Sequence, residues 1–184
     1  MPVRRSSTPP LKAVISTVEG ATHARAPGLL LGVGLGGFLD GIVLHQILQW
    51  HHLLSSTDDH PVDTVAGLEV NTLADGLFHL GTWLAVFAGA ALALRARQRH
   101  RLAPGWRFQM GLLLAGWGLF NVVEGVVDHH LLGLHHVRDD LGAPPSWDVG
   151  FLAAGVLLSL GGWVLHRPGE PPALAEAQGA GPAR

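Results

Sequence analysis

The chain has 184 residues, of which 48% are hydrophobic and only 14% charged, and its mean hydropathy is +0.31. An ordinary soluble domain carries about a quarter charged residues, so this composition argues against a plain soluble enzyme. The long apolar runs exclude a disordered chain. The net charge is −2 with the 12 histidines counted as neutral, which leaves no broad basic surface for nucleic acid. There is no cysteine, so disulfides and thiolate metal sites are excluded.

Four apolar stretches approach or reach the roughly 20 residues that a membrane-spanning helix needs. They cover about residues 28–50, 70–94, 108–132 and 149–166. We therefore expect an all-α, four-helix transmembrane bundle over residues 28–167. The flanking segments, 1–27 and 168–184, are rich in Pro, Ala, Gly and Ser, and we expect a disordered leader and a disordered tail.

Basic residues predict how the helices are oriented. The leader and the connection between the second and third helices are rich in arginine, whereas residues 51–69 contain no Lys or Arg and the third connection contains only Arg138. By the positive-inside rule, both termini and the arginine-rich connection are cytoplasmic. The two histidine-rich connections then face the extracytoplasmic side.

The first and third helices resemble each other. Residues 29–52 align without a gap on residues 113–136, and 11 of the 24 aligned pairs are identical, including three histidine pairs. Asp40 also aligns with Glu124. We expect two helical hairpins related as a parallel repeat, with a pseudo-twofold axis along the membrane normal. The second and fourth helices match poorly, although Asp75 can be aligned with Asp148.

Ionisable side chains interrupt the apolar stretches. A carboxylate at the centre of a membrane helix costs about 2.5–3.5 kcal/mol on insertion scales, so each one needs a partner. On a helical wheel with 100° per residue, these ionisable side chains fall toward one face of each helix, although Asp40 and His45 are about 140° apart. The candidate metal ligands, or residues that orient the ligands, are His45, His79, His129, Asp40, Asp75, Glu124 and Asp128.

A second, weaker set of candidates is expected to form a rim at the outer surface: His51, His52, His135 and His136. Imidazole with carboxylate suits a transition metal such as Zn, Cu or Fe, and facing histidines could also ligate haem. The sequence leaves two alternatives open. One is a self-satisfied His–Asp hydrogen-bond network, and the other is proton or ion translocation.

Three sequence segments carry a family resemblance. GVGLGGFLDGIVLHQILQWHH (32–52), ADGLFHLGTW (74–83) and FNVVEGVVDHHLLGLHHVRDD (120–140) resemble the bacterial predicted membrane proteins grouped as domain of unknown function 2243. The resemblance implies a multi-pass protein of the bacterial plasma membrane without an established activity. An association of some relatives with cytochrome oxidase assembly factors points toward copper or haem handling. The family supplies no catalytic residues to carry over.

The resulting hypothesis is a metal or haem site that opens to the extracytoplasmic side, in respiratory oxidase assembly or electron transfer. Its expected partners are the lipid bilayer and respiratory-complex or assembly proteins, with a homo-oligomer as a further option and no nucleic acid. Three alternatives remain: a metal-dependent membrane hydrolase, a proton-coupled transporter and a structural membrane subunit.

Overall fold

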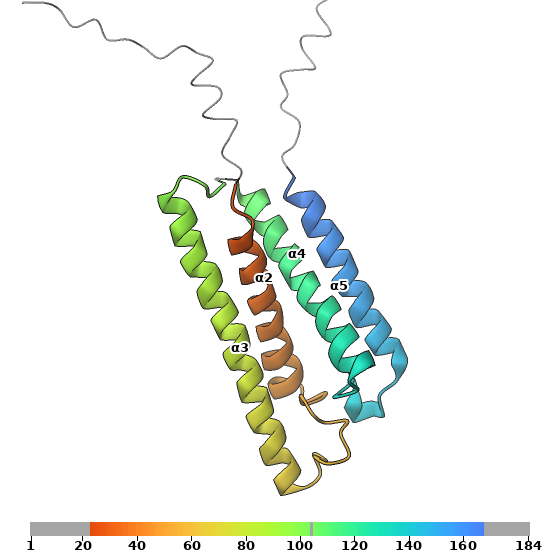
Figure 1. Cartoon of the computed structure of the whole chain (residues 1–184). Helices are drawn as coiled ribbons and strands as arrows, with labels where there is room; N and C mark the ends of the chain where they lie inside the picture. The colour runs from red at the N-terminus through yellow and green to blue at the C-terminus, as the bar shows by residue number, and fades with distance from the viewer. Residues whose placement is uncertain (1–22, 104, 168–184) are drawn as a thin grey trace, which may run out of the picture.

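The computed structural model describes residues 23–103 and 105–167, and this part of the chain contains helices and loops but no strand (Figure 1). Four helices are long and apolar enough to cross a membrane. Two of them end in π-helical segments, and a short 3₁₀ turn precedes the last. In chain order the elements are α2 (Ala26–Leu39), η1 (Asp40–Ile47), α3 (Val65–Gln98), α4 (Trp106–Glu124), η2 (Gly125–Leu131), η3 (Asp139–Leu141) and α5 (Pro145–Leu165).

The all-helical, four-span prediction is confirmed, with changed boundaries. α3 begins at Val65 rather than near residue 70, because the Thr64 hydroxyl caps it by accepting a hydrogen bond from the Gly67 N–H at 3.1 Å. α2 begins at Ala26, with Pro27 in its first turn, so the predicted leader is too long by two residues. The rest of that leader up to residue 22, and the predicted tail from residue 168, lie outside the described residues.

The helices pack side by side in the order α3, α2, α4, α5 (Figure 1). α2 contacts both α3 and α4, and α4 contacts α5, while the two outer helices do not touch each other. Within the apolar windows, 44% of α2–η1 and of α4–η2 is buried by protein, against 11% of α3 and 17% of α5. The outer helices therefore present most of their surface to lipid, and α2 and α4 form the centre.

α2 and α4 approach each other closely where two glycines meet. A Cβ atom on Gly32 would lie 2.1 Å from the Leu113 carbonyl oxygen, and one on Gly116 would lie 2.1 Å from the Leu29 carbonyl oxygen. Only glycine permits this backbone contact, which is the small-residue packing typical of membrane helices. The contact holds α2 and α4 close together.

The interior of this protein is unusually polar. Among the described residues, few large apolar side chains are buried, whereas leucines and valines on α3 and α5, such as Leu77 and Leu157, are exposed. Such exposure suits a surface solvated by lipid. The side chains buried inside are instead largely histidine, carboxylate and asparagine.

The two central helices end in a widened winding. The Leu48 N–H donates to the Val43 carbonyl and the Leu132 N–H donates to the Val127 carbonyl, each over five residues and each at 2.8 Å. π-helical turns are rare, and they occur frequently at functional sites. Both π segments lie at the same end of the molecule (Figure 1).

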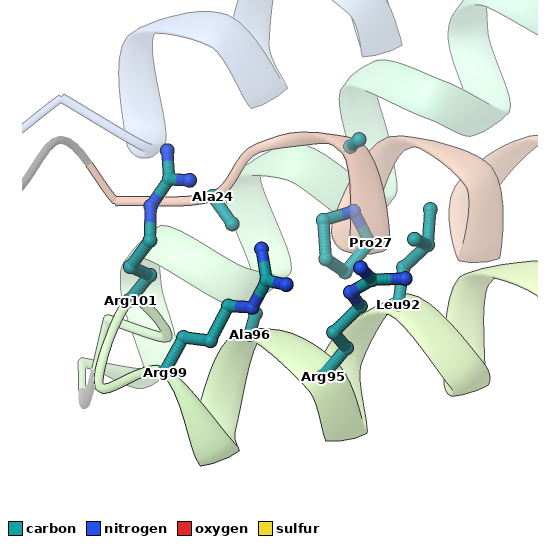
Figure 2. Close-up of a pocket in the computed structure, with 8 residues that line it drawn as sticks. Ala24, Pro27, Leu92, Arg95, Ala96, Arg99 and Arg101 are labelled. Atoms are coloured by element: carbon teal, nitrogen blue, oxygen red, sulfur yellow. The ribbon is translucent and has the colours of Figure 1, made fainter.

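Arginines gather at the opposite end. Arg95, Arg99 and Arg101 surround a pocket of about 220 Å³ between the start of α2 and the end of α3, as Figure 2 shows. The two described chain ends, His23 and Arg167, lie at this same end (Figure 1). The molecule therefore has one cationic end and one histidine-rich end.

Candidate metal centre

Four buried side chains converge where the two π segments meet. One ligand atom from each of His45, His51, Glu124 and His135 lies within 4.8 Å of the other three. His45 and His135 are fully inaccessible to solvent, and His51 and Glu124 are 2% and 4% exposed. Two ligands of one Zn²⁺ ion at about 2.0–2.2 Å stand roughly 3 Å apart, so a modest contraction of this group would complete a coordination sphere.

The π segments bring each carboxylate to the histidine five residues later. His45 Nε2 lies 3.0 Å from Asp40 Oδ2, and His129 Nε2 lies 3.9 Å from Glu124 Oε1. Regular α-helical winding would separate such a pair by about 140° around the axis. The wider π turn reduces this angle, so Asp40 and His129 join the group at its border.

Asp75, on α3, orients the ring of His45 by binding its Nδ1 atom. Its carboxylate accepts hydrogen bonds from His45 Nδ1 at 2.9 Å and from His52 Nδ1 at 2.6 Å. It also accepts from the Gln46 amide and from the Leu53 N–H. A carboxylate that binds one ring nitrogen of histidine leaves the other nitrogen free to ligate a metal, as in carboxylate–histidine–zinc arrangements.

Asp148, on α5, is the counterpart of Asp75 in the second hairpin and lies beside His129. It accepts from His136 Nδ1 at 2.7 Å and from the Val137 N–H at 2.9 Å, and its Oδ1 lies 3.4 Å from His129 Nδ1. The prediction of site residues omitted Asp148. The sequence offered one signal for it: Asp148 stands three residues before Phe151, as Asp75 stands three residues before Phe78. In the structure, the Phe151 ring lies 5.3 Å from the ring of His129, and the Phe78 ring lies 5.5 Å from the ring of His45.

The loops after η1 and η2 fold inward and cross. His51 Nδ1 donates to the Val137 carbonyl at 3.0 Å, and His135 Nδ1 donates to the Leu53 carbonyl at 3.1 Å. The two rings stack with centroids 4.6 Å apart. The expectation that His51 and His135 line an outer rim is therefore wrong, because each loop is tied to a carbonyl of the other loop and carries its histidine inward.

Burial lowers the pKa of His51 and lowers that of His135 well below its usual value. Both side chains are therefore neutral at pH 7, and neutral imidazole is the form that binds a metal. His52 and His136, the other two predicted rim residues, remain partly exposed and bind Asp75 and Asp148 respectively.

Several buried polar atoms in this region lack a hydrogen-bond partner among the described residues. Such orphans are rare in native proteins, because each costs about 1–3 kcal/mol. All but one belong to the cluster or to its border. The atoms are Asp40 Oδ1 and Oδ2, His45 Nε2, His51 Nε2, Glu124 Oε2, His129 Nδ1 and Nε2, and, outside the cluster, His79 Nε2. Of these, Asp40 Oδ2 and His45 Nε2 lie 3.0 Å apart as an ion-pair contact.

Two of the predicted site residues lie apart from the convergent group. His79 packs against Gly41 and stacks on Phe38, with ring centroids 6.4 Å apart. Asp128 lines an apolar pocket of about 280 Å³ between α2, α3 and α4, which Glu124 also lines. A separate, more polar pocket of about 490 Å³ lies among the loops and reaches His51. The cluster thus has a polar approach from its loop side and an apolar one from the side of the helices.

Comparisons with known proteins give one family. Searches of curated proteins and of solved structures find no significant match. The profile of the family described as Predicted membrane protein (DUF2243) matches residues 27–169, which include all four spans and both histidine-rich connections. The chain is therefore a multi-pass membrane protein that belongs to the DUF2243 family.

Proposed function

We propose that this protein binds a divalent transition-metal ion within the membrane, through His45, His51, Glu124 and His135. The observation that carries the proposal is the convergence of their ligand atoms within 4.8 Å in a buried site. Three imidazoles with one carboxylate suit Zn²⁺ or Fe²⁺, and the lack of cysteine disfavours Cu⁺.

A self-satisfied hydrogen-bond network is the main alternative, and it accounts for only the outer part of the site. Asp75 and Asp148 have their oxygens occupied by ring and backbone N–H groups. Asp40 Oδ1 and Glu124 Oε2 are buried and have no such partner among the described residues. A network that existed for structure alone would satisfy these buried oxygens, whereas a bound cation would do so directly.

The packing of the rings favours a bare ion over haem. A haem stands between two axial ligands and needs a slot as wide as the macrocycle. The rings of His51 and His135 are stacked 4.6 Å apart, and His45 lies 4.5 Å from His51 by ring centroid. Ligands that converge this tightly suit a single atom at their centre.

The positive-inside rule supports a site near the extracytoplasmic face, because the cluster lies at the end of the bundle opposite to the arginines. The polar pocket at His51 offers a route for ions from that face. A role in respiratory oxidase assembly or electron transfer stays a prediction from the family resemblance.

Metal analysis of the purified full chain tests the proposal. The protein is extracted in detergent, stripped with a chelator, reloaded with Zn²⁺ or Fe²⁺, and measured by elemental analysis and visible spectroscopy. We expect stoichiometric metal without a Soret band. His51→Ala should weaken binding by at least tenfold, whereas the matched control His60→Ala, in the same loop but outside the cluster, should bind as the wild type does. Absence of stoichiometric metal after reloading would overturn the proposal, as would a Soret band that accounts for all bound iron.

A further inference from the structure

The group of four ligands has a counterpart in the same cavity. A shift of 84 residues converts His45 to His129, Glu124 to Asp40, and His51 and His135 into each other. The ring of His129 lies 4.7 Å from that of His135, as the ring of His45 lies 4.5 Å from that of His51. His129 thus bears the same relation to the stacked pair as His45 does, and Asp40 is the residue that aligns with Glu124.

One ion leaves part of this cluster unexplained. A four-coordinate ion on the first group takes one atom from each of its four members. His129 Nε2 and Asp40 Oδ1 then remain buried without a hydrogen-bond partner among the described residues, and Asp40 Oδ2 faces the His45 Nε2 atom, 3.0 Å away, that the first ion would bind. The two residues are only 3% and 4% exposed, so water does not solvate them freely. Unsatisfied buried atoms of this number call for a second cation.

The carboxylates lie between the two groups. Glu124 approaches His129 of its own hairpin at 3.9 Å, and its ligand atom also lies within 4.8 Å of that of His45. Asp40 lies 3.0 Å from His45 of its own hairpin. Glu124 therefore lies between imidazoles of both hairpins, which is the placement of a bridging ligand, and Asp40 is its counterpart in the alignment of the two hairpins.

Charge balance gives an independent reason. Four buried carboxylates surround the cluster: Asp40, Asp75, Glu124 and Asp148. The partners that the structure gives these four groups are imidazoles, an amide and backbone N–H groups, and the guanidinium of Arg138 pairs instead with the exposed Asp140. Buried charge without a counter-charge is strongly unfavourable. Two divalent cations would balance four carboxylates.

From these observations we infer that the cavity holds two divalent metal ions, one centred on His45 and the other on His129, with His51 and His135 divided between them and Asp40 and Glu124 bridging. The inference rests on the proposed metal site; it adds a second ion and assigns one of the two stacked histidines, His51 or His135, to that ion. Metal pairs bound in this way usually lie about 3.5–4 Å apart.

Metal stoichiometry on matched variants tests the inference. The full chain is stripped, loaded with Zn²⁺ and analysed for metal per chain. We expect two equivalents in the wild type and one each in His45→Ala and His129→Ala. His130→Ala, the neighbour of His129 outside the cluster, should keep two equivalents. Circular dichroism and gel filtration check that each variant is folded and monodisperse.

A second measurement needs no variant. The wild-type chain loaded with Mn²⁺ should give the electron paramagnetic resonance spectrum of a spin-coupled pair, whereas a half-loaded sample should show more of the isolated six-line signal. One equivalent of metal with an uncoupled spectrum would overturn the second ion and leave the proposed site standing. Zero equivalents would overturn both. Two equivalents with His129→Ala unchanged would also refute the assignment.

Discussion

The two hairpins make the same contacts with different flanking residues. In each, an aspartate on the outer helix binds a histidine after the π segment, His52 in one and His136 in the other, at 2.6 and 2.7 Å. The same aspartates accept from the N–H of Leu53 and of Val137, both at 2.9 Å. What the hairpins share is therefore the set of contacts that orients the imidazoles.

The differences lie just outside those contacts. Gln46 donates to Asp75, whereas its counterpart His130 donates to the Gly125 carbonyl of its own helix. His79 faces Gly41, whereas Leu152 faces Gly125 at the corresponding position. The first hairpin thus has more hydrogen bonds around its aspartate. These differences between two otherwise similar hairpins can be tested by substituting corresponding residues in each.

Removal of metal should have the largest effect, because the site joins the two hairpins. At a free metal concentration of 100 times Kd, binding contributes about 2.7 kcal/mol to stability. For a chain of this size we expect a chelator to lower the Tm of the loaded protein by roughly 5–10 °C. Thermal unfolding in detergent, followed by circular dichroism, measures the shift. An equal shift in His51→Ala would show that the chelator acts elsewhere.

The paired substitutions Asp75→Asn and Asp148→Asn should differ. Loss of a carboxylate that orients metal ligands typically costs about 10–100-fold in metal affinity. Asp75 accepts four hydrogen bonds and Asp148 two, so we expect about 100-fold for Asp75→Asn and about tenfold for Asp148→Asn. Competition with a chromogenic chelator gives both affinities. A larger loss for Asp148→Asn would contradict the asymmetry.

The contact between α2 and α4 should depend equally on its two glycines, Gly32 and Gly116. Gly32→Ala and Gly116→Ala each force α2 and α4 apart, and we expect a similar loss of about 1–3 kcal/mol for both. Gly81→Ala is the control, because nothing lies within 4 Å of a Cβ atom there. Thermal unfolding compares the three. A loss confined to one of the central glycines would contradict equivalent packing.

The smallest effect is expected where the chain leaves each π segment. Gln49 and Gly133 occupy corresponding left-handed positions, with φ of 50° and 59°. Gly133→Ala should cost about 1 kcal/mol, because a Cβ atom is strained in that region. Gln49→Gly should change stability by less than about 1 kcal/mol, because relief of strain offsets the greater freedom of the unfolded chain. Melting curves distinguish these outcomes, and a Gly133→Ala protein as stable as the wild type would contradict them.

The prediction of four helices succeeded because hydropathy and length dominate in a membrane, where each backbone polar group must be satisfied within its own segment. The prediction that carboxylates and imidazoles gather near one end also depended only on position along the helices. His45, Glu124 and Asp40 could be selected this way, because ionisable side chains in apolar stretches are conspicuous.

The winding of the helix ends could not be deduced from the same pattern. A regular helix separates Asp40 from His45, and only the π turn of η1 brings them to 3.0 Å. His51 and His135 were expected outside because they follow the apolar stretches. They lie at the centre of the cluster because each loop is tied to a backbone carbonyl of the other loop, at Val137 and Leu53.

The sequence by itself thus determined the class of protein, the spans and the kinds of side chain that the membrane interior must accommodate. These follow from the local cost of placing each residue in lipid. The tertiary structure decided which imidazoles meet, that Asp148 stands behind His129, and that His79 lies outside the convergent group. Those outcomes depend on contacts between residues that are distant in sequence, such as the hydrogen bond of His51 with the Val137 carbonyl, 86 positions away, which no local pattern encodes.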